Sequence, residues 1–287
     1  MIGVKIKFFI INQIMKQVLF VLLSWSGWAV ANNEIYLELT GEPLQGALII
    51  GQTNPGASVK IDNQSTPLTD DGHFIFGFGR FDEKDKVVRV DFQGQQLEST
   101  VKVIKRDFPT ERIDGLPSDK VNAPQQDWER IKKEQAQVKQ ARGVWSEQKA
   151  FLESFIWPAQ GRVSGVYGSR RILNGEPKRP HYGMDIANVT GTPVVAPASG
   201  VVTMAVNDHF YTGGTVIIDH GYGLNTTFLH LSKVDVEEGQ KLAQGEKLGE
   251  IGATGRATGP HLDWRMNIGT GLRLDPQLVI PEKYKNN

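Results

Sequence analysis

Short runs of alternating apolar and polar residues, separated by glycine and other turn formers, set the strongest limit on how this chain can fold. The segment Val88-Arg-Val-Asp-Phe92 alternates without interruption, and phenylalanine recurs at every second position from Phe74 to Phe78. Successive side chains of a strand point to opposite faces, so these runs predict half-buried strands. The chain contains 31 glycines, many of which bound such runs. We therefore predict a mainly β fold built from short strands.

Residues 32–106 are predicted to form a small β-sandwich. Their alternating runs follow one another at about ten-residue spacing, which is typical of sandwiches. Turn signals such as Asn54-Pro55-Gly56 and Asp70-Asp71-Gly72 separate the runs. No cluster of titratable side chains stands out here, so we interpret this unit as a binding or positioning domain, or as a spacer.

Residues 107–155 are predicted to form a linker followed by one long amphipathic helix. Pro109 and the segment Gly115-Leu-Pro117 indicate a linker up to residue 122, and Asp127 is the expected N-cap. An apolar stripe then recurs every seven residues, at Ile131, Val138, Trp145 and Leu152, and charged residues, Arg142 among them, fill the other faces. Such a helix either connects domains while packed on one of them or self-associates as a coiled coil.

Residues 156–287 are predicted to form a glycine-rich antiparallel β-sheet or open barrel with a groove. Five of the six histidines lie in this part of the chain, at positions 181, 209, 220, 230 and 261. Because the histidines are concentrated there, we expect a catalytic or metal-binding site in the C-terminal unit.

The first 31 residues have the features of a secretory signal. Lys5, Lys7 and Lys16 supply positive charge, an apolar run begins at Val18, and Ala29-Val-Ala31 fits a small-x-small cleavage site. We expect cleavage after Ala31, no stable membrane anchor after cleavage, and a location in the periplasm or outside the cell. Both Met1 and Met15 fit as the start of this signal.

Charge and cysteine content narrow the choice of partners. The chain has 32 basic and 32 acidic residues, so its formal net charge is zero and no bulk attraction to nucleic acid is expected. It has no cysteine, which excludes disulfides and leaves His, Asp and Glu as the ligands for zinc.

Two separated segments each offer a histidine and a carboxylate. In Pro180-His-Tyr-Gly-Met-Asp185, proline and glycine argue against a helix, and the even separation of His181 and Asp185 puts both on one face of an extended chain. In the strand predicted after Pro260, the side chains of His261, Asp263 and Arg265 share a face. We predict that the segments converge on one zinc ion per chain, bound by His181, Asp185 and Asp263.

The remaining histidines divide into candidates for catalysis and structural residues. His230 is expected to follow the alternation of the strand Phe228–Ser232, and its imidazole is a candidate for proton transfer or oxyanion stabilisation. His209 and His220 are interpreted as structural.

The ordered set of these segments resembles the lysostaphin-type zinc metallopeptidases, which cleave peptidoglycan cross-bridges. The resemblance covers residues 156–281 and rests on His181-xxx-Asp185, Ile217-Ile-Asp-His-Gly221, Thr227-Phe-Leu-His-Leu-Ser232 and Gly252–His261. It implies that His181 and Asp185 bind zinc, that His230 and His261 are catalytic, and that the substrates are peptide cross-links of peptidoglycan. Residues 112–117 and the preceding β-domain resemble the N-terminal part of Gram-negative secreted members.

One position departs from the family. The motif usually ends His-x-His, with the second histidine as the third zinc ligand, and here that position is Asp263. If Asp263 binds zinc, the site carries two anionic ligands and the ion is a weaker Lewis acid. If Asp263 instead pairs with Arg265, the metal keeps two ligands. We favour ligation because both candidate catalytic histidines are present.

Two classes of function follow. The first is a secreted zinc endopeptidase that hydrolyses peptide cross-links of peptidoglycan, or another extracellular peptide. The second is a catalytically impaired wall-binding regulator or activator of another wall hydrolase. Four of the five motif residues are retained, which favours the enzyme.

Overall fold

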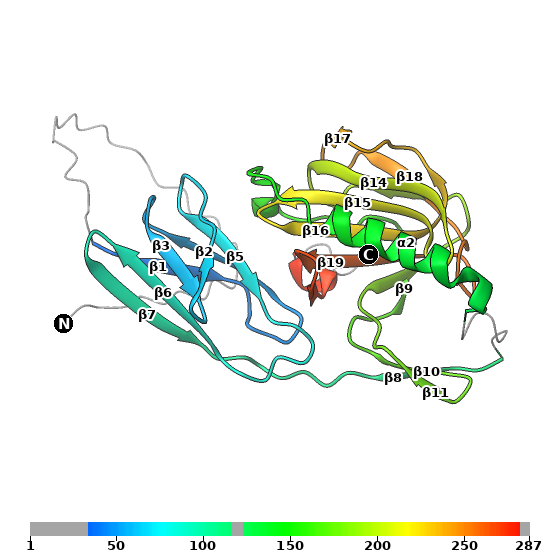
Figure 1. The fold of residues 1–287 in the computed structure, drawn as a ribbon, viewed down its shortest axis with the longest axis horizontal. Coiled ribbons are helices and arrows are strands. Elements are labelled where there is room, and N and C mark those ends of the chain that lie inside the picture. The colour runs from blue at the N-terminus through cyan, green and yellow to red at the C-terminus, as the bar shows by residue number, and fades with distance from the viewer. Residues whose placement is uncertain (1–33, 116–122, 282–287) are drawn as a thin grey trace, which may run out of the picture.

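The computed structural model describes residues 34–115 and 123–281. The predicted signal segment, residues 1–31, lies outside these ranges. Strands dominate the described part, as predicted, and Figure 1 shows two β units with one α-helix lying across the C-terminal one. Within the described ranges, no helix has the length and apolar character needed to cross a membrane.

The N-terminal unit consists of two antiparallel sheets that share a core. One sheet contains β1 (Leu37–Thr40), β2 (Leu48–Thr53) and β5 (His73–Gly77), and the other contains β3 (Ser58–Ile61), β4 (Gln64–Thr66), β6 (Lys86–Phe92) and β7 (Gln95–Val101). Ile49, Phe74 and Val88 are buried between the sheets. This is the sandwich that the alternating runs predicted.

The segment that follows the sandwich is partly a strand. β8 (Thr110–Ile113) pairs in parallel with β10 (Arg170–Leu173), which in turn pairs with β11 (Glu176–Lys178). The predicted linker is therefore tied to the C-terminal unit, because its backbone donors and acceptors are satisfied by the edge of β10.

The helix is shorter than predicted. After a 3-10 turn, η1 (Gln125–Asp127), α2 spans Trp128–Arg142, with Asp127 at the N-cap position but without a side-chain cap. The prediction that it continues through Leu152 was wrong. It ends at Gly143, a poor helix former whose N–H donates to the carbonyls of Lys139 and Gln140.

The C-terminal half of α2 packs on the sheet, as a connector would. Ala141 lies in a cluster with Met204 and Ile217, and Val138 packs against the same cluster. Arg142 is only 6% exposed, so its assignment to a solvent face was also wrong.

The C-terminal unit is built on one large sheet whose strands all pair antiparallel. Its strand order is β17-β14-β15-β16-β19-β12-β9, with β13, β18 and β20 attached. The bounds are β9 (Arg162–Gly165), β12 (Met184–Ala187), β13 (Pro193–Val195), β14 (Gly200–His209), β15 (Gly213–Gly221), β16 (Leu224–Val234), β17 (Lys241–Leu242), β18 (Lys247–Ile251), β19 (His261–Ile268) and β20 (Leu272–Leu274). Two short 3-10 turns, η2 (Ala150–Leu152) and η3 (Pro276–Val279), flank it.

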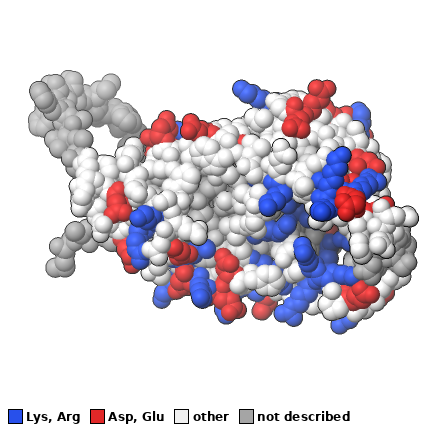
Figure 2. Space-filling view, viewed as in Figure 1, with Lys and Arg blue, Asp and Glu red and all other residues white. Residues whose placement is uncertain are grey.

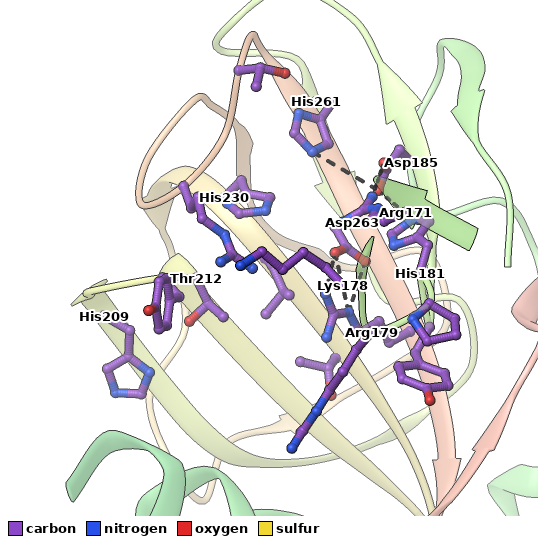
Figure 3. Close-up of a pocket in the computed structure, with 18 of the residues that line it drawn as sticks. Arg171, Lys178, Arg179, His181, Asp185, His209, Thr212, His230, His261 and Asp263 are labelled. Carbon is purple, nitrogen blue, oxygen red and sulfur yellow. Dashed lines mark hydrogen bonds and ion pairs between the residues drawn. The ribbon is translucent and has the colours of Figure 1, made fainter. Parts of the chain in front are cut away.

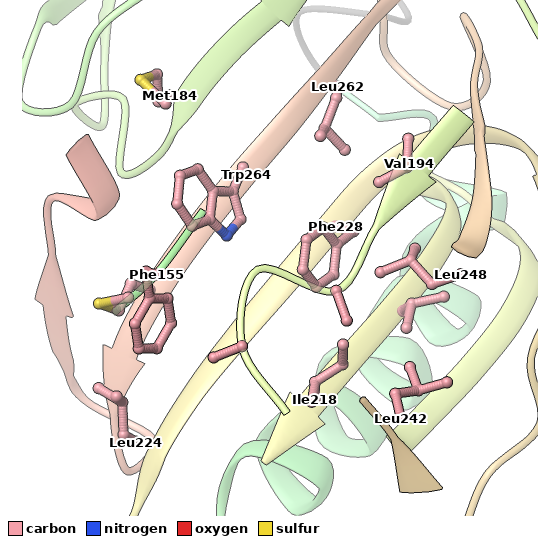
Figure 4. Packing of buried hydrophobic residues seen from close by; sticks show 14 of the residues in the cluster. Phe155, Met184, Val194, Ile218, Leu224, Phe228, Leu242, Leu248, Leu262 and Trp264 are labelled. Carbon is pink, nitrogen blue, oxygen red and sulfur yellow. The ribbon is translucent and has the colours of Figure 1, made fainter. Parts of the chain in front are cut away.

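The two faces of this sheet have different chemistry. One face carries Ile218, Phe228 and Trp264, which are fully buried in a large apolar cluster with Phe155 and Leu248 (Figure 4). On the other face, Thr227 is paired with Arg265, and Leu229 with Asp263. Buried polar and charged side chains on this second face need hydrogen-bond or ion-pair partners there.

The two β units are packed against each other. Leu48 and Ile75 of the N-terminal strands belong to the large C-terminal cluster. The Arg106 guanidinium lies 2.9 Å from the buried carboxylate of Asp275, and Arg80 Nε donates to the carbonyl of Gly168 at 2.5 Å. The proposed units at 32–106 and 156–287 thus form a continuous body.

Candidate metal centre

Strand register brings the three predicted ligands together. β12 and β19 are antiparallel, with Asp185 directly opposite Asp263. His181 precedes β12 and is fixed by its backbone, since its N–H donates to Ser169 O at 2.9 Å and its carbonyl accepts from Gly168 N at 2.8 Å. One ligand atom from each of His181, Asp185 and Asp263 lies within 4.8 Å of the others. Figure 3 shows the three side chains directed at one another.

Two glycines allow the backbone to pass close to the carboxylates. A Cβ at Gly183 would lie 2.7 Å from Arg265 Cγ and would also collide with a carboxylate oxygen of Asp263. A Cβ at Gly165 would lie 2.9 Å from Asp185 Cγ. Any larger residue at these positions would displace the acidic side chains.

The unpartnered atoms at this point fit a metal ion. His181 Nε2 lies 2.9 Å from Asp185 Oδ1, yet neither atom forms a hydrogen bond with a described residue, and the same holds for His181 Nδ1. Buried polar atoms without partners are costly and rare. Imidazole nitrogen and carboxylate oxygen are donors that zinc accepts. The site therefore suits zinc, although ligation by these residues stays a prediction.

The position of Asp263 is compatible with both arrangements that the sequence left open. Besides facing His181 and Asp185, its carboxylate accepts from Arg265 Nε at 3.0 Å and from Arg265 Nη2 at 2.6 Å. Burial alone would raise the pKa of Asp263, but the Arg265 guanidinium, assisted by His181, holds this pKa well below its usual range. A carboxylate has about four lone-pair sites, so pairing with arginine does not exclude a metal.

A second arginine, which the sequence did not reveal, orients Asp185. Arg171 Nη2 lies 3.2 Å from Asp185 Oδ2, and Arg171 Nε lies 3.4 Å from the carboxylate of Glu111 on β8. Asp185 therefore has one oxygen held by arginine and the other, Oδ1, directed at His181. Such support of a ligand by neighbouring groups is typical of metal sites.

The two candidate catalytic histidines lie side by side. Their ring centroids are 4.9 Å apart, and His261 Nε2 is 4.0 Å from Asp185 Oδ1. His230 Nδ1 is bonded to Thr254 O at 2.9 Å, and His261 Nδ1 to Gly259 O at 2.8 Å. A carbonyl can only accept, so each Nδ1 carries hydrogen and each Nε2 is left to accept a proton.

His230 reaches the groove because its strand is irregular, so the expected alternation was wrong. Phe228 and Leu231 are both buried in the core, and the pairing of β16 with β15 slips by one residue between them. His230 has a φ of 66°, a left-handed value that is uncommon outside glycine. This bulge allows Leu229 and His230 to line the same groove. Burial lowers the pKa of His230 to about 4, which keeps the imidazole neutral near pH 7.

The other two histidines differ from each other. His220 is fully buried, with Nδ1 bonded to Ser199 O and Nε2 to Thr226 Oγ1, both at 2.7 Å, which is a structural arrangement. His209 is buried beside Thr212 and lines the groove away from the three ligands (Figure 3).

The site opens into a groove of about 1310 Å³ between the sheet, α2 and the β8–β10–β11 strands. Ten Lys and Arg residues line it against four Asp and Glu residues. Figure 2 shows basic side chains gathered over this part of the molecule. A chain of zero net charge thus concentrates positive charge at its candidate site.

Comparison with known proteins relates this site to one family. Residues 179–276 match Peptidase family M23, a range that includes all five candidate residues. The C-terminal unit is therefore similar to the peptidases of family M23. The resemblance seen in the sequence is thereby confirmed.

Relatives of the matched region include peptidases, one of which is named for peptidoglycan. The chain is 43% identical over 125 residues to peptidoglycan DD-endopeptidase ShyA of Vibrio cholerae, covering 43% of this chain and 28% of that protein. It is 40% identical over 118 residues to DD-carboxypeptidase/endopeptidase Mpg of Neisseria meningitidis, covering 41% and 27%. The chain thus spans little more than a quarter of the length of these relatives.

A solved structure also matches across both β units. It is the crystal structure of a candidate M23 peptidase from Pseudomonas aeruginosa, with a TM-score of 0.63 and 28% identity, covering 83% of this chain and 95% of that one. The N-terminal strands and the C-terminal unit therefore recur together in another protein.

Proposed function

We propose that this chain is an exported, zinc-dependent endopeptidase that hydrolyses peptide cross-links of peptidoglycan. The observation that carries the proposal is the convergence of His181, Asp185 and Asp263 beside the histidine pair, His230 and His261, in a unit similar to the M23 peptidases. The name of the Vibrio cholerae relative supports a peptidoglycan substrate, and the name of the Neisseria meningitidis relative supports peptide hydrolysis.

The chemistry divides between the metal ligands and the histidine pair. His181, Asp185 and Asp263 would hold one zinc ion, which when bound polarises a peptide carbonyl and acidifies water. The Nε2 atoms of His230 and His261 are free to accept a proton from the attacking water and to return one to the leaving amine. Neutral imidazoles are needed for the first task, and the low pKa of His230 meets that need.

The proposed location follows from the predicted signal at residues 1–31, with cleavage after Ala31. In the periplasm or outside the cell, the mature chain would meet cross-link peptides of the wall directly. Nucleic acid is not among the proposed partners, since the net charge is zero.

Residues 32–287, purified and loaded with zinc, provide the test. We expect about one zinc per chain by metal analysis and release of soluble fragments from purified peptidoglycan. His261→Ala is the matched control and should retain zinc while releasing fragments at least about a hundredfold more slowly. Zinc-loaded protein that releases no more than this control would overturn the proposal, and peptidoglycan binding without release would point to the regulator instead.

A further inference from the structure

Arg142, the last residue of α2, is a buried cation that faces the groove without an acidic partner. Its side chain is 6% exposed, and its Nε and Nη2 donate only to the hydroxyl of Thr227, at 3.3 and 3.1 Å. Among the described residues, no carboxylate lies within ion-pair distance of it, and its Nη1 forms no hydrogen bond. A buried guanidinium is normally paired with an acid.

Two further arginines lie around Arg142 and increase its need for an anion. Burial, assisted by the nearby guanidiniums of Arg265 and Arg273 and opposed only in part by the carboxylate of Asp263, lowers the pKa of Arg142 to about 9. Arg265 is already engaged by Asp263, while Arg273 has its guanidinium 4.9 Å from the ring of Tyr182 and no ion pair with a described residue. Two guanidiniums that line the groove, on Arg142 and Arg273, therefore have no ion-pair partner among the described residues.

We propose that Arg142 and Arg273 form a carboxylate-binding subsite, which takes a carboxylate of the peptide substrate at one side of the candidate metal centre. This inference rests on the proposed function, since it names a chemical feature of the substrate in the same groove. Thr227, which holds Arg142, is paired across the sheet with Arg265, and that arginine holds Asp263. The subsite is thus connected to the metal ligands through one row of side chains.

A carboxylate fits this subsite better than a neutral group. Guanidinium binds carboxylate through two parallel N–H bonds, and such charged bonds are about twice as strong as neutral ones. A carboxylate at Arg142 would satisfy the free Nη1 and offset the repulsion between the arginines. The excess of basic over acidic residues along the groove would attract an anionic peptide to it.

Equilibrium binding tests the subsite without any turnover. The probes are cross-linked peptide dimers released from purified peptidoglycan, used as free acids and after carbodiimide amidation of their carboxyl groups. Each is titrated by calorimetry onto residues 32–287 treated with EDTA, at physiological salt. We expect the wild-type protein to bind the free acid about tenfold to a hundredfold more tightly than the amide, the range of one charge-assisted hydrogen-bonded pair.

Three variants separate a specific subsite from general attraction. Arg142→Gln should reduce the ratio of the two affinities to near one, and Arg273→Gln should reduce it in part. Lys139→Gln removes the same charge from an exposed position of the same helix that also lines the groove, and it should lower the ratio far less than Arg142→Gln does. The ratio does not depend on the folded fraction, because both peptides are titrated onto one preparation.

The proposal is overturned if the wild-type protein does not discriminate between the two peptides, or if Arg142→Gln retains the wild-type ratio. Equal loss of preference in Lys139→Gln and Arg142→Gln also overturns it, because the preference would then come from the overall charge of the groove. Should Arg142→Gln fail to fold, Arg273→Gln decides the matter alone. Because binding is measured in EDTA, these outcomes are independent of whether the zinc-loaded protein hydrolyses peptidoglycan.

Discussion

Replacing the Asp263 carboxylate with an amide should affect both metal binding and folding. In Asp263→Asn the side chain keeps its size but loses its charge, and Arg265 loses its only ion-pair partner among the described residues. Breaking a buried pair costs about 3–5 kcal/mol. The Arg265 side chain is 22% exposed, so we expect the lower end, about 3 kcal/mol. For a chain of this size, that corresponds to a fall in Tm of roughly 5–10 °C.

The same change should weaken zinc binding if Asp263 is a ligand. Structural zinc sites with four ligands bind with about 10–16 kcal/mol, or roughly 2.5–4 kcal/mol per ligand. The dissociation constant for zinc should therefore rise about a hundredfold to a thousandfold in Asp263→Asn. Arg265→Gln should bind zinc at least as tightly as the wild type, because the carboxylate remains and loses its competing cation.

A double-mutant cycle separates the two effects. Tm is measured by circular dichroism in EDTA, and zinc affinity by competition with a chelating dye, for the wild type, Asp263→Asn, Arg265→Gln and the double variant. The double variant should recover about 2 kcal/mol of the summed losses in stability, as expected for a directly contacting pair. If the zinc affinity of Asp263→Asn stays within threefold of wild type, Asp263 is only the partner of Arg265 and our ligand set is wrong.

Three further predictions follow from the same geometry. His230→Ala and His261→Ala should each lower the rate of peptidoglycan digestion by about 10²–10⁴ while zinc content stays at wild type; normal digestion by either variant would remove that histidine from the mechanism. The folded-state pKa of His230, about 4, lies below its ordinary value of 6.5. The unfolded chain therefore takes up a proton first, and the zinc-free protein should lose about 3 kcal/mol as the pH falls through this window. Urea titrations check this, since His230→Gln should remove that part of the pH dependence, and an unchanged slope would contradict the assignment. Gly183→Ala should destabilise the fold by about 1–3 kcal/mol and weaken zinc binding, because its methyl would collide with Asp263. Gly271→Ala, where nothing lies within 4 Å, should change neither property.

Much of the fold could be predicted from side-chain alternation, because apolar residues at every second position mark the buried face of a strand. The runs around Phe74 and Val88 form the predicted sandwich, and both lie in its core. The end of α2 was harder to predict from the sequence, because the apolar stripe continues to Leu152 although the helix ends at Gly143. Its sequence did hold one signal: Arg142 falls four residues after Val138, on the stripe itself, and a charged residue there indicates a buried polar site.

The candidate site was predictable in its members but not in its arrangement. Even spacing grouped His181 with Asp185, and His261 with Asp263, yet only strand register places Asp185 opposite Asp263. The irregularity at His230 depends on the fit between β15 and β16 and leaves no local pattern. Contacts between distant segments, such as Arg171 with Asp185, arise from the fold as a whole.

The parallel pairing of β8 with β10 has a consequence for any attempt to isolate the C-terminal unit. A chain cut before residue 156 would lose β8 and α2 together, which exposes a row of unpaired backbone groups along β10 and uncovers Met204 and Ile217. An exposed strand edge next to apolar surface can pair with a strand of another molecule. The fragment should therefore self-associate and aggregate when it is concentrated. Sedimentation would show this, and residues 107–155 would be needed to keep the fragment monomeric.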